Sequence, residues 1–364
     1  MHLLSMVNTV IRKFEQKVVI PLFPGLEWLF EFRNANKEVR LRGGIATQLW
    51  AWHKGFYLES VKLCGITRAN VNEYLSDKAY LKLHPINNIY SAIIDNKLYL
   101  PFLLKDYPDL APIYYYVIDK GRLVNIAPVI SVDHGLLQLC KEKLNLALKP
   151  CTSTMGHGFY RLQWKNEKFL LNNQPVEVSE LESLIDSLDG YLVTEYIIQN
   201  QYAAEINQSS VNTIRLICVR DSFNNKFFIP TANHRFGTEG RVVDNIGAEG
   251  GAMAAFIDIS TGRLKNIGIV KENGIVKKTL NVIIHPESKK QITNTVIPHW
   301  PEMVSKVLSV LNHLSFLKFV GLDIVITENG FKIIEINSLP TLMGIQMEEG
   351  VLRDERLKRF FLDK

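Results

Sequence analysis

The first quarter of the chain carries hydrophobic residues at helical spacing. Residues 45–65, IATQLWAWHKGFYLESVKLCG, place apolar side chains three and four positions apart, which predicts an amphipathic helical segment. Thr67 precedes the run RANVNEYLSD, and we expect it to cap a further helix there. Short β-prone runs punctuated by prolines follow. The pattern predicts a helical region over residues 1–90 and a small α/β unit over residues 91–133.

Beyond residue 133, runs with strand propensity outnumber amphipathic helices. We expect helices over residues 133–143, 178–189 and 300–314, with Ser179 as the N-cap of the second and Glu182 as its capping-box partner. Successive strands mixed with helices are typical of α+β layers and not of a doubly wound parallel sheet. The expected strands are residues 144–150, 159–164, 191–198, 211–220, 226–236 and 252–260.

The segment 321–342, GLDIVITENGFKIIEINSLPTL, places acidic residues in runs that otherwise read as buried strand. An Asn-Gly pair between two β-prone runs predicts a hairpin. Strict alternation puts Ile333, Glu335 and Asn337 on one face of the second strand. Pairing across the turn then brings Asp323 near Glu335 or Asn337. Hard oxygen ligands of this kind suit magnesium that bridges phosphates, and a solvated hairpin with acids facing water is the alternative.

Composition and charge narrow the class of protein. The chain has 364 residues, of which 47% are hydrophobic, and a net charge of +5 from dispersed basic residues, which does not indicate nucleic-acid binding. Its four cysteines form no CxxC pair, so we expect neither a zinc site nor a disulfide framework. No segment approaches ~20 uninterrupted apolar residues. We therefore expect a cytoplasmic protein without a transmembrane segment.

A small, hydroxyl-rich loop follows the strand that ends at Lys149. Glycines let backbone N–H groups approach phosphate oxygens, hydroxyls donate hydrogen bonds, and a lysine supplies a point charge. The loop lacks the GxxxxGK[ST] pattern, so a P-loop NTPase is not expected, and an ordinary tight turn is the alternative. Its candidate phosphate-binding residues are Thr152, Ser153, Thr154, Gly156 and Gly158.

The strand YLVTEYIIQ ends in a sequence that suits a purine. Glu195 and the apolar pair Ile197 and Ile198 precede Gln199, and a purine requires an apolar slot with polar groups along one edge. The alternative is an ordinary core strand with an exposed Glu. The next strand carries Asn212 at its start, a candidate for binding metal or phosphate.

Two arginines on later strands are candidates for binding anions. Arg215 can grip a phosphate or a developing oxyanion with two parallel hydrogen bonds, or it pairs structurally with Asp323. His234 and Arg235 end a strand before a glycine-rich loop, and such long polar loops usually cover or bind a ligand. For His234, a base and a structural histidine both remain open. The further candidates in this loop are Arg241, Asn245, Gly250 and Gly251.

In this order, the motifs over residues 134–342 resemble the ATP-grasp superfamily. SSVNTIRL, HRFGTEGRVVDNIGAEGG and the terminal hairpin resemble its sugar-transfer-associated branch, which is found with capsule and exopolysaccharide genes. The resemblance implies an ATP-grasp fold of two α+β subdomains that grip ATP, over residues 134–199 and 200–364. It covers no motif before about residue 130.

The resemblance also implies roles for the candidate residues. Lys149 and the following loop would hold the ATP phosphates, Glu195, Ile197 and Ile198 the adenine, and Gln199 or Glu205 the ribose. Arg215, Lys149 and Arg235 would be catalytic, and Asp323, Glu335 and Asn337 would bind Mg²⁺. The substrate-binding set would be Asn212, His234, Arg235, Arg241, Asn245, Gly250 and Gly251.

The activity implied is that of an Mg-ATP-dependent carboxylate–amine ligase with an acyl-phosphate intermediate. The expected substrates are a small carboxylate and an amine, with an amino acid or amine joined to a sugar acid or nucleotide sugar in surface polysaccharide synthesis. An amino-acid ligase and a non-catalytic nucleotide-binding partner of a glycosyltransferase are the alternatives, and a homodimer remains open. The sequence departs from the superfamily at Tyr196, where a lysine is common, and in the ending Ser-Leu-Pro-Thr-Leu.

Overall fold

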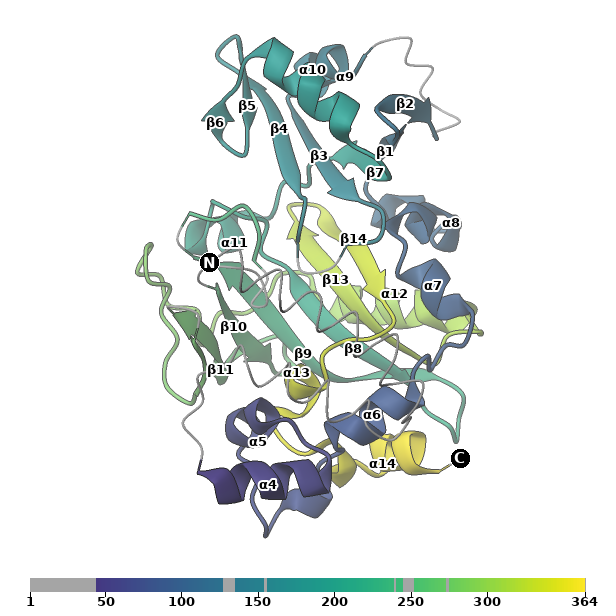
Figure 1. Cartoon of the computed structure of the whole chain (residues 1–364), viewed down its shortest axis with the longest axis vertical. Coiled ribbons are helices and arrows are strands. Elements are labelled where there is room, and N and C mark those ends of the chain that lie inside the picture. The colour runs from purple at the N-terminus through teal and green to yellow at the C-terminus, as the bar shows by residue number, and fades with distance from the viewer. Residues whose placement is uncertain are drawn as a thin grey trace, which may run out of the picture. The chain divides into compact units, whose positions relative to one another are not determined.

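The computed structural model describes residues 44–126, 135–153, 156–238, 240–244, 252–272 and 275–363 (Figure 1). The chain divides into two compact units, one made of the segments up to Leu83 and from Leu342 onward, and the other running from His84 to Thr341. No helix in these ranges is both long and apolar enough to cross a membrane. Every candidate site residue belongs to the second unit.

The first unit is helical, as the pattern of residues 45–65 predicts. Its first two helices are separated at Gly55, which adopts a left-handed conformation with φ of 79° and so ends the first helix. The elements of this unit are α4 (Ile45–Lys54), α5 (Leu58–Cys64), η3 (Val71–Glu73), α6 (Asp77–Leu83), α13 (Leu342–Gln346), η6 (Val351–Arg353) and α14 (Glu355–Leu362).

Two predicted helix caps are wrong. The backbone N–H and the hydroxyl of Thr67 both donate to Asn70 Oδ1, at 2.7 and 3.1 Å, so the segment forms a turn and the short η3 instead of an α-helix. In the later helix, Glu177 is the N-cap in place of Ser179, and it forms a capping box with Glu180. A carboxylate two residues earlier satisfies the free N–H groups equally well.

The second unit contains two seven-stranded antiparallel sheets. In the first, here called sheet A, the strand order is β2-β1-β7-β3-β4-β5-β6. One face of sheet A packs Leu146, Leu148 and Val193 with the helices α9 (Leu136–Lys143) and α10 (Val178–Ser187). Its strands are β1 (Tyr114–Asp119), β2 (Arg122–Asn125), β3 (Asn145–Pro150), β4 (Tyr160–Lys165), β5 (Lys168–Leu171), β6 (Gln174–Pro175) and β7 (Tyr191–Glu195).

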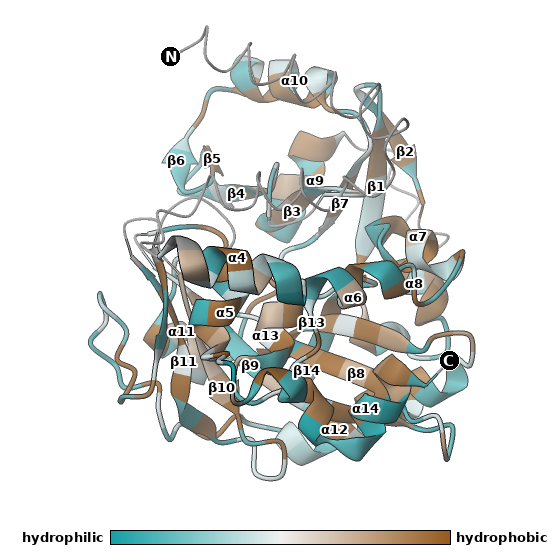
Figure 2. Cartoon of the chain, turned by 60° about the horizontal axis from the view of Figure 1, so that its bottom comes forward, coloured by the Kyte–Doolittle hydropathy of each residue, from teal (hydrophilic) through white to brown (hydrophobic). Residues whose placement is uncertain are grey.

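The second sheet, here called sheet B, has the order β12-β11-β10-β9-β8-β13-β14. The helix α12 (Trp300–His313) buries Trp300, Met303 and Val307 in the same core as one face of this sheet, and β8 is hydrophobic over most of its length (Figure 2). Its strands are β8 (Ile214–Arg220), β9 (Phe227–Gly237), β10 (Ala252–Ile257), β11 (Leu264–Glu272), β12 (Ile275–Thr279), β13 (Phe319–Thr327) and β14 (Gly330–Asn337), of which the sequence analysis did not predict β11 and β12.

Short elements complete this unit. A segment before sheet A contains α7 (Tyr90–Ile94), η4 (Lys97–Tyr99), α8 (Leu100–Leu103) and η5 (Pro108–Leu110), and α11 (Gln201–Ile206) joins β7 to β8. The strands β1 and β2, which fall in the expected unit of residues 91–133, are part of sheet A. The mixture of antiparallel sheets and helices confirms the predicted α+β class.

The predicted hairpin is confirmed, but its faces differ from the prediction. Asp323 pairs with Glu335, whereas the next residue, Ile324, pairs with Ile333, so Ile334 is an extra residue in a β-bulge. The bulge reverses the alternation, and Ile333 therefore packs in the apolar core on the face opposite Glu335. The prediction that Ile333, Glu335 and Asn337 share one face is wrong for Ile333.

Candidate functional site

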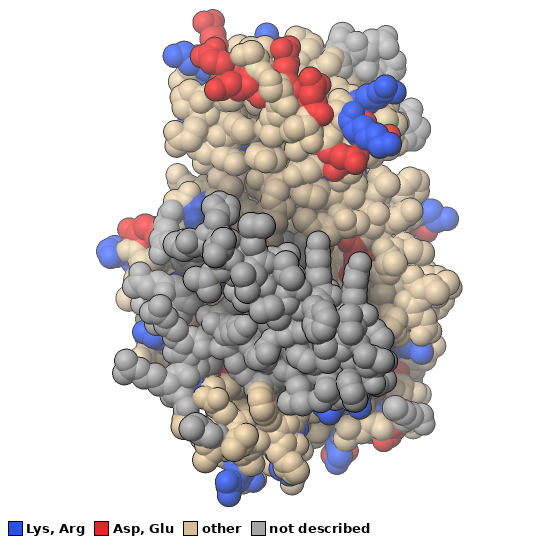
Figure 3. All heavy atoms as spheres, in the orientation of Figure 1, with Lys and Arg blue, Asp and Glu red and all other residues tan. Residues whose placement is uncertain are grey.

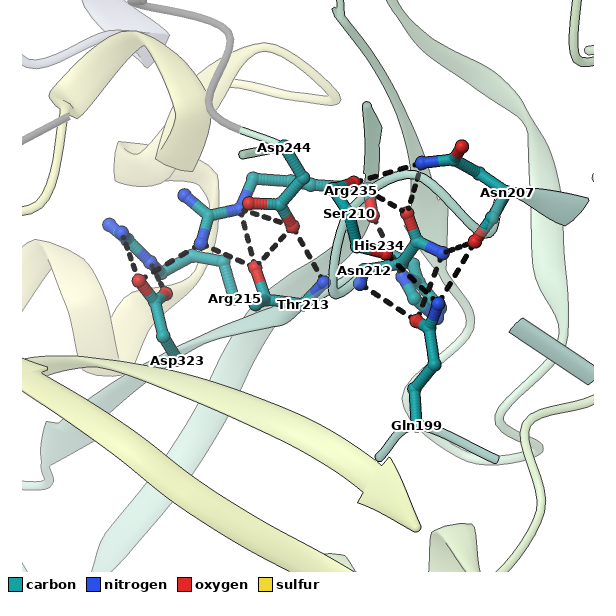
Figure 4. A network of polar contacts seen from close by, with 10 residues as sticks. All are labelled: Gln199, Asn207, Ser210, Asn212, Thr213, Arg215, His234, Arg235, Asp244 and Asp323. Atoms are coloured by element: carbon teal, nitrogen blue, oxygen red, sulfur yellow. Dashed lines mark hydrogen bonds and ion pairs between the residues drawn. The ribbon is translucent and has the colours of Figure 1, made fainter. Parts of the chain in front are cut away.

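A buried carboxylate lies between two arginines on the polar face of sheet B. Asp323, on β13, is 5% exposed and lies opposite Arg215 of β8 in the sheet register. Arg215 donates to both of its oxygens, from Nε at 2.5 Å and from Nη2 at 3.0 Å, and Arg235 Nη2 approaches Oδ2 at 2.9 Å (Figure 4). Burial alone would raise the pKa of Asp323, but the two guanidinium groups hold it well below its usual range.

Arg235 is anchored from its other side by Thr213. The Thr213 hydroxyl accepts hydrogen bonds from Nε at 3.0 Å and Nη2 at 2.6 Å, and Asp244 Oδ2 lies 3.9 Å from Nε. Burial opposes the charge on this arginine, but the carboxylates of Asp323 and Asp244 together raise its pKa above the ordinary value. The guanidinium group therefore remains charged.

Two lysines bring charge from outside sheet B to the same place. Lys149, at the end of β3 in sheet A, lies with Nζ 3.5 Å from the carbonyl oxygen of Ile334 in the bulge. Lys97, on η4, donates to the carbonyl of Ser153 at 2.6 Å and lies 3.3 Å from Glu335 Oε1. Burial, together with the neighbouring Lys97, lowers the pKa of Lys149 to about 8.

Lys97 is a site residue that the sequence analysis missed. It stands within NKLYLP, where no motif marks it, and only its place in the fold brings it to Glu335. Its backbone N–H also donates to Cys151 O at 2.9 Å, so it is fixed to the start of the hydroxyl-rich loop. The sequence analysis also missed Asp244, although it lies within the motif HRFGTEGRVVDNIGAEGG.

The predicted metal ligands offer a donor set that fits magnesium. The side-chain oxygen of Asn337 is buried and has no hydrogen-bond partner in the described part of the chain. A Cβ atom at Gly321 would come within 2.5 Å of this oxygen, so only glycine leaves it room. Glu335, with its side chain 25% exposed, and Asp323 add carboxylates, and Mg²⁺ prefers such oxygens. No group of three or more His, Cys, Asp and Glu side chains in the described ranges forms a metal cluster.

The end of β7 presents backbone and aromatic surface. Glu195 accepts a hydrogen bond from the Ile113 N–H at 2.9 Å and lies 3.7 Å from Lys332 Nζ, so its carboxylate is already paired. The following Tyr196 lies beneath the guanidinium group of Arg161, whose central carbon is 4.1 Å from the ring centroid. An arginine on this ring thus supplies a positive charge at the end of β7.

Gln199 and Asn212 face each other and form hydrogen bonds with each other and with the neighbouring backbone. Gln199 Oε1 accepts from both the N–H and the Nδ2 of Asn212, at 2.9 and 3.0 Å, and its Nε2 donates to the carbonyls of Asn207 and Ser210, both at 2.9 Å. Asn212 is 1% exposed. This network holds the turn between α11 and β8 and uses the polar atoms of both side chains.

Two further predicted residues, His234 and Glu205, have their contacts away from Asp323. His234 is fully buried, its Nε2 is 2.7 Å from the Tyr202 hydroxyl, and burial lowers its pKa to about 3, so the imidazole is neutral. Glu205 pairs with Lys290 at 3.2 Å on the surface.

The described loop residues near Lys149 are consistent in conformation with the predicted loop. Gly156 and Gly158 have φ of 73° and 74°, in the left-handed region that favours glycine. Thr152 of this loop is exposed. In the loop after β9, the backbone N–H of Arg241 donates to Thr238 O at 3.4 Å. Four predicted residues lie outside the described residues: Thr154, Asn245, Gly250 and Gly251.

The structure therefore brings together only part of the predicted set. Around Asp323 and Glu335 it gathers Arg215, Arg235 and Lys149, with Asn337 two pairs further along the hairpin. On the face of the molecule seen in Figure 3, acidic and basic side chains are interspersed over the described surface.

Comparisons with known proteins identify related sequences and folds. The model of a family described as sugar-transfer associated ATP-grasp matches residues 87–360. No curated protein matches the chain. A D-alanine–D-alanine ligase from Bacillus anthracis is 13% identical with a TM-score of 0.40, covering 78% of this chain and 73% of that one. An L-amino acid ligase from Bacillus licheniformis is 9% identical with a TM-score of 0.35, covering 73% of this chain and 48% of that one.

Asp323 should be essential to the stability of the free protein. Asp323→Asn would leave the buried Arg235 and the partly buried Arg215 without their shared carboxylate, so we expect a loss of about 3–5 kcal/mol in the free energy of unfolding, measured by urea denaturation. Glu335→Gln, at a more exposed position, should lose about 1 kcal/mol or less. Equal losses in the two variants would contradict this account of the ion pairs.

Proposed function

Because the chain belongs to the sugar-transfer associated ATP-grasp family, we propose that it is an Mg-ATP-dependent carboxylate–amine ligase that forms an amide through an acyl phosphate. The ATP-grasp fold is that of ATP-dependent ligases that form C–N bonds. One observation carries the proposal for this chain: Lys97 lies 3.3 Å from Glu335 Oε1, and Lys149 of sheet A lies 3.5 Å from the carbonyl oxygen of Ile334, the residue before Glu335. A phosphate chain held between the two lysines and a magnesium ion on the oxygen ligands would contact cations on both sides.

Phosphoryl transfer requires positioning and charge neutralisation more than a protein nucleophile. The carboxylate of the first substrate attacks the γ-phosphorus and ADP leaves. The amine then attacks the carbonyl carbon of the acyl phosphate, inorganic phosphate leaves, and the amide remains. Asp323, Glu335 and Asn337 would hold Mg²⁺, which neutralises phosphate charge when bound.

The chain's own cations have separate tasks in this scheme. Lys149 and Lys97 bind and orient the phosphates. Arg215 and Arg235, held on the polar face of sheet B, stabilise the negative charge that develops on the transferring group and on the tetrahedral intermediate. Such preorganised donors contribute most where burial excludes water, which is the situation of Arg235, while Arg215 is partly buried.

The proposed substrates are an amino acid or amine and a sugar acid or nucleotide sugar, joined in the cytoplasm during surface polysaccharide synthesis. The family description supports the link to sugar transfer. The charged set argues against a module that only binds nucleotide, since nucleotide binding alone does not require both arginines beside the oxygen ligands. An amino-acid ligase remains the alternative that the substrate screen would reveal.

A screen of ADP release tests the proposal. Amino acids crossed with uronic acids and nucleotide sugars, with Mg-ATP, should give ADP and an amide-linked product by mass spectrometry. Glu335→Gln should abolish turnover while the variant remains folded, because a proposed metal ligand is lost. Products that contain only amino acids would favour the peptide ligase, and ATP binding without any turnover would favour the non-catalytic module.

The lowered pKa of Lys149 predicts a pH dependence of nucleotide binding. Below a pKa of about 8 the free protein carries the charged amine, and above it the amine is neutral. We therefore expect the affinity for a non-hydrolysable ATP analogue to fall by up to about tenfold per pH unit as the pH rises above 8. Calorimetry between pH 7 and 9.5 measures this.

Two variants serve as controls for the lysine. The arginine of Lys149→Arg keeps its charge throughout this range. The affinity of this variant for the ATP analogue should therefore stay constant as the pH passes 8. Lys149→Met should bind weakly at every pH without the same transition. A transition at pH 8 that persists in Lys149→Met would assign the titration to another group.

A further inference from the structure

Thr213 lies between a carboxylate and a guanidinium group, and its contacts have a direction. Its backbone N–H and its hydroxyl both donate to Asp244 Oδ2, at 2.6 and 2.7 Å. A hydroxyl has one proton. Because the Thr213 hydroxyl donates it in the hydrogen bond to Asp244, its lone pairs accept from Arg235 Nε and Nη2. The order of hydrogen bonds therefore runs from Arg235 through Thr213 to Asp244 (Figure 4).

We propose that Asp244, acting through Thr213, is a positioning residue that fixes Arg235 beside Asp323. The inference rests on the proposed ligase function, in which Arg235 stabilises developing negative charge. Asp244 itself touches neither substrate nor metal in this scheme. It determines where the guanidinium group of Arg235 points.

The need for such a device follows from the competition for Arg235. Its guanidinium group has two buried carboxylates within reach, Asp323 at 2.9 Å and Asp244 at 3.9 Å. The hydroxyl of Thr213 occupies the edge formed by Nε and Nη2, and Asp244 Oδ2 stays 3.9 Å from Nε, beyond hydrogen-bond distance.

The second carboxylate also compensates charge. Arg235 is 8% exposed, and a buried cation requires a partner. If Asp323 shares its oxygens with magnesium, its hold on Arg235 weakens, and Asp244 keeps the guanidinium group neutralised. Burial raises the pKa of Asp244, while Arg235 and Thr213 oppose this rise.

Asp244 is also well placed with respect to the phosphates. The residue before it, Val243, packs at Gly156 of the hydroxyl-rich loop, where an added Cβ would lie 3.0 Å from Val243 Cγ1. The segment that carries Asp244 thus borders the loop that follows Lys149. Positioning of Arg235 is therefore built into the part of the fold that would receive the phosphate chain under the proposed function.

Three threonine variants test the inference. Thr213→Val removes the hydroxyl at nearly constant volume, Thr213→Ser keeps it, and Thr231→Val is the matched control on β9. Thr231 is also buried, and its hydroxyl has no hydrogen-bond partner among the residues the structure describes. We expect kcat to fall about 10- to 100-fold in Thr213→Val, with KM for ATP unchanged within about twofold. Thr213→Ser and Thr231→Val should retain most of the wild-type kcat.

A second readout does not require turnover. The rate at which phenylglyoxal modifies Arg235, followed by peptide mass spectrometry, should rise in Thr213→Val and in Asp244→Asn. It should stay at the wild-type rate in Thr213→Ser and Thr231→Val. Wild-type kcat and labelling rate in a folded Thr213→Val variant would overturn the inference. If the variants show this labelling pattern but the wild-type protein has no turnover in the ADP-release screen, the proposed ligase function alone is overturned.

Discussion

The structure of the site depends on one buried carboxylate and the cations around it. Asp323 is buried on β13, where an unpaired charge would be strongly destabilising, and two arginines, from β8 and β9, compensate it. A shift of one residue in the pairing of β13 with β8 would remove Arg215 from Asp323 and expose the apolar face. Electrostatic pairing and apolar burial therefore specify the same register.

The two faces of sheet B divide stability from chemistry. The face toward α12 is apolar and packs Leu322, Ile324 and Ile333 in the core. The opposite face carries the arginines and the proposed metal ligands. The bulge at Ile334 allows this division, because the extra residue turns Ile333 inward while Glu335 stays beside Asp323. It also presents the carbonyl of Ile334 to Lys149.

Support for the arginines extends beyond the groups that would meet a substrate. Thr213 and Asp244 continue the contacts of Arg235, and Lys97 links Glu335 to the start of the hydroxyl-rich loop. Each contact uses a charged or strongly polar donor in a largely buried place, where such hydrogen bonds are strongest. The polar groups thus hold one another in place, and the surrounding apolar core limits their movement.

The sequence by itself determined the α+β class, the terminal hairpin and the family, because strand periodicity, an Asn-Gly turn and motif order can be read directly from the chain, but it left Glu335 and Asn337 open as the partner of Asp323. Only the tertiary structure decided the bulge that turns Ile333 inward, the role of Lys97, and the internal bonding of Gln199 with Asn212. Lys97 meets a residue far away in the chain, and the other two depend on which side chains the fold buries. Burial and long-range pairing set them, and no local pattern records either.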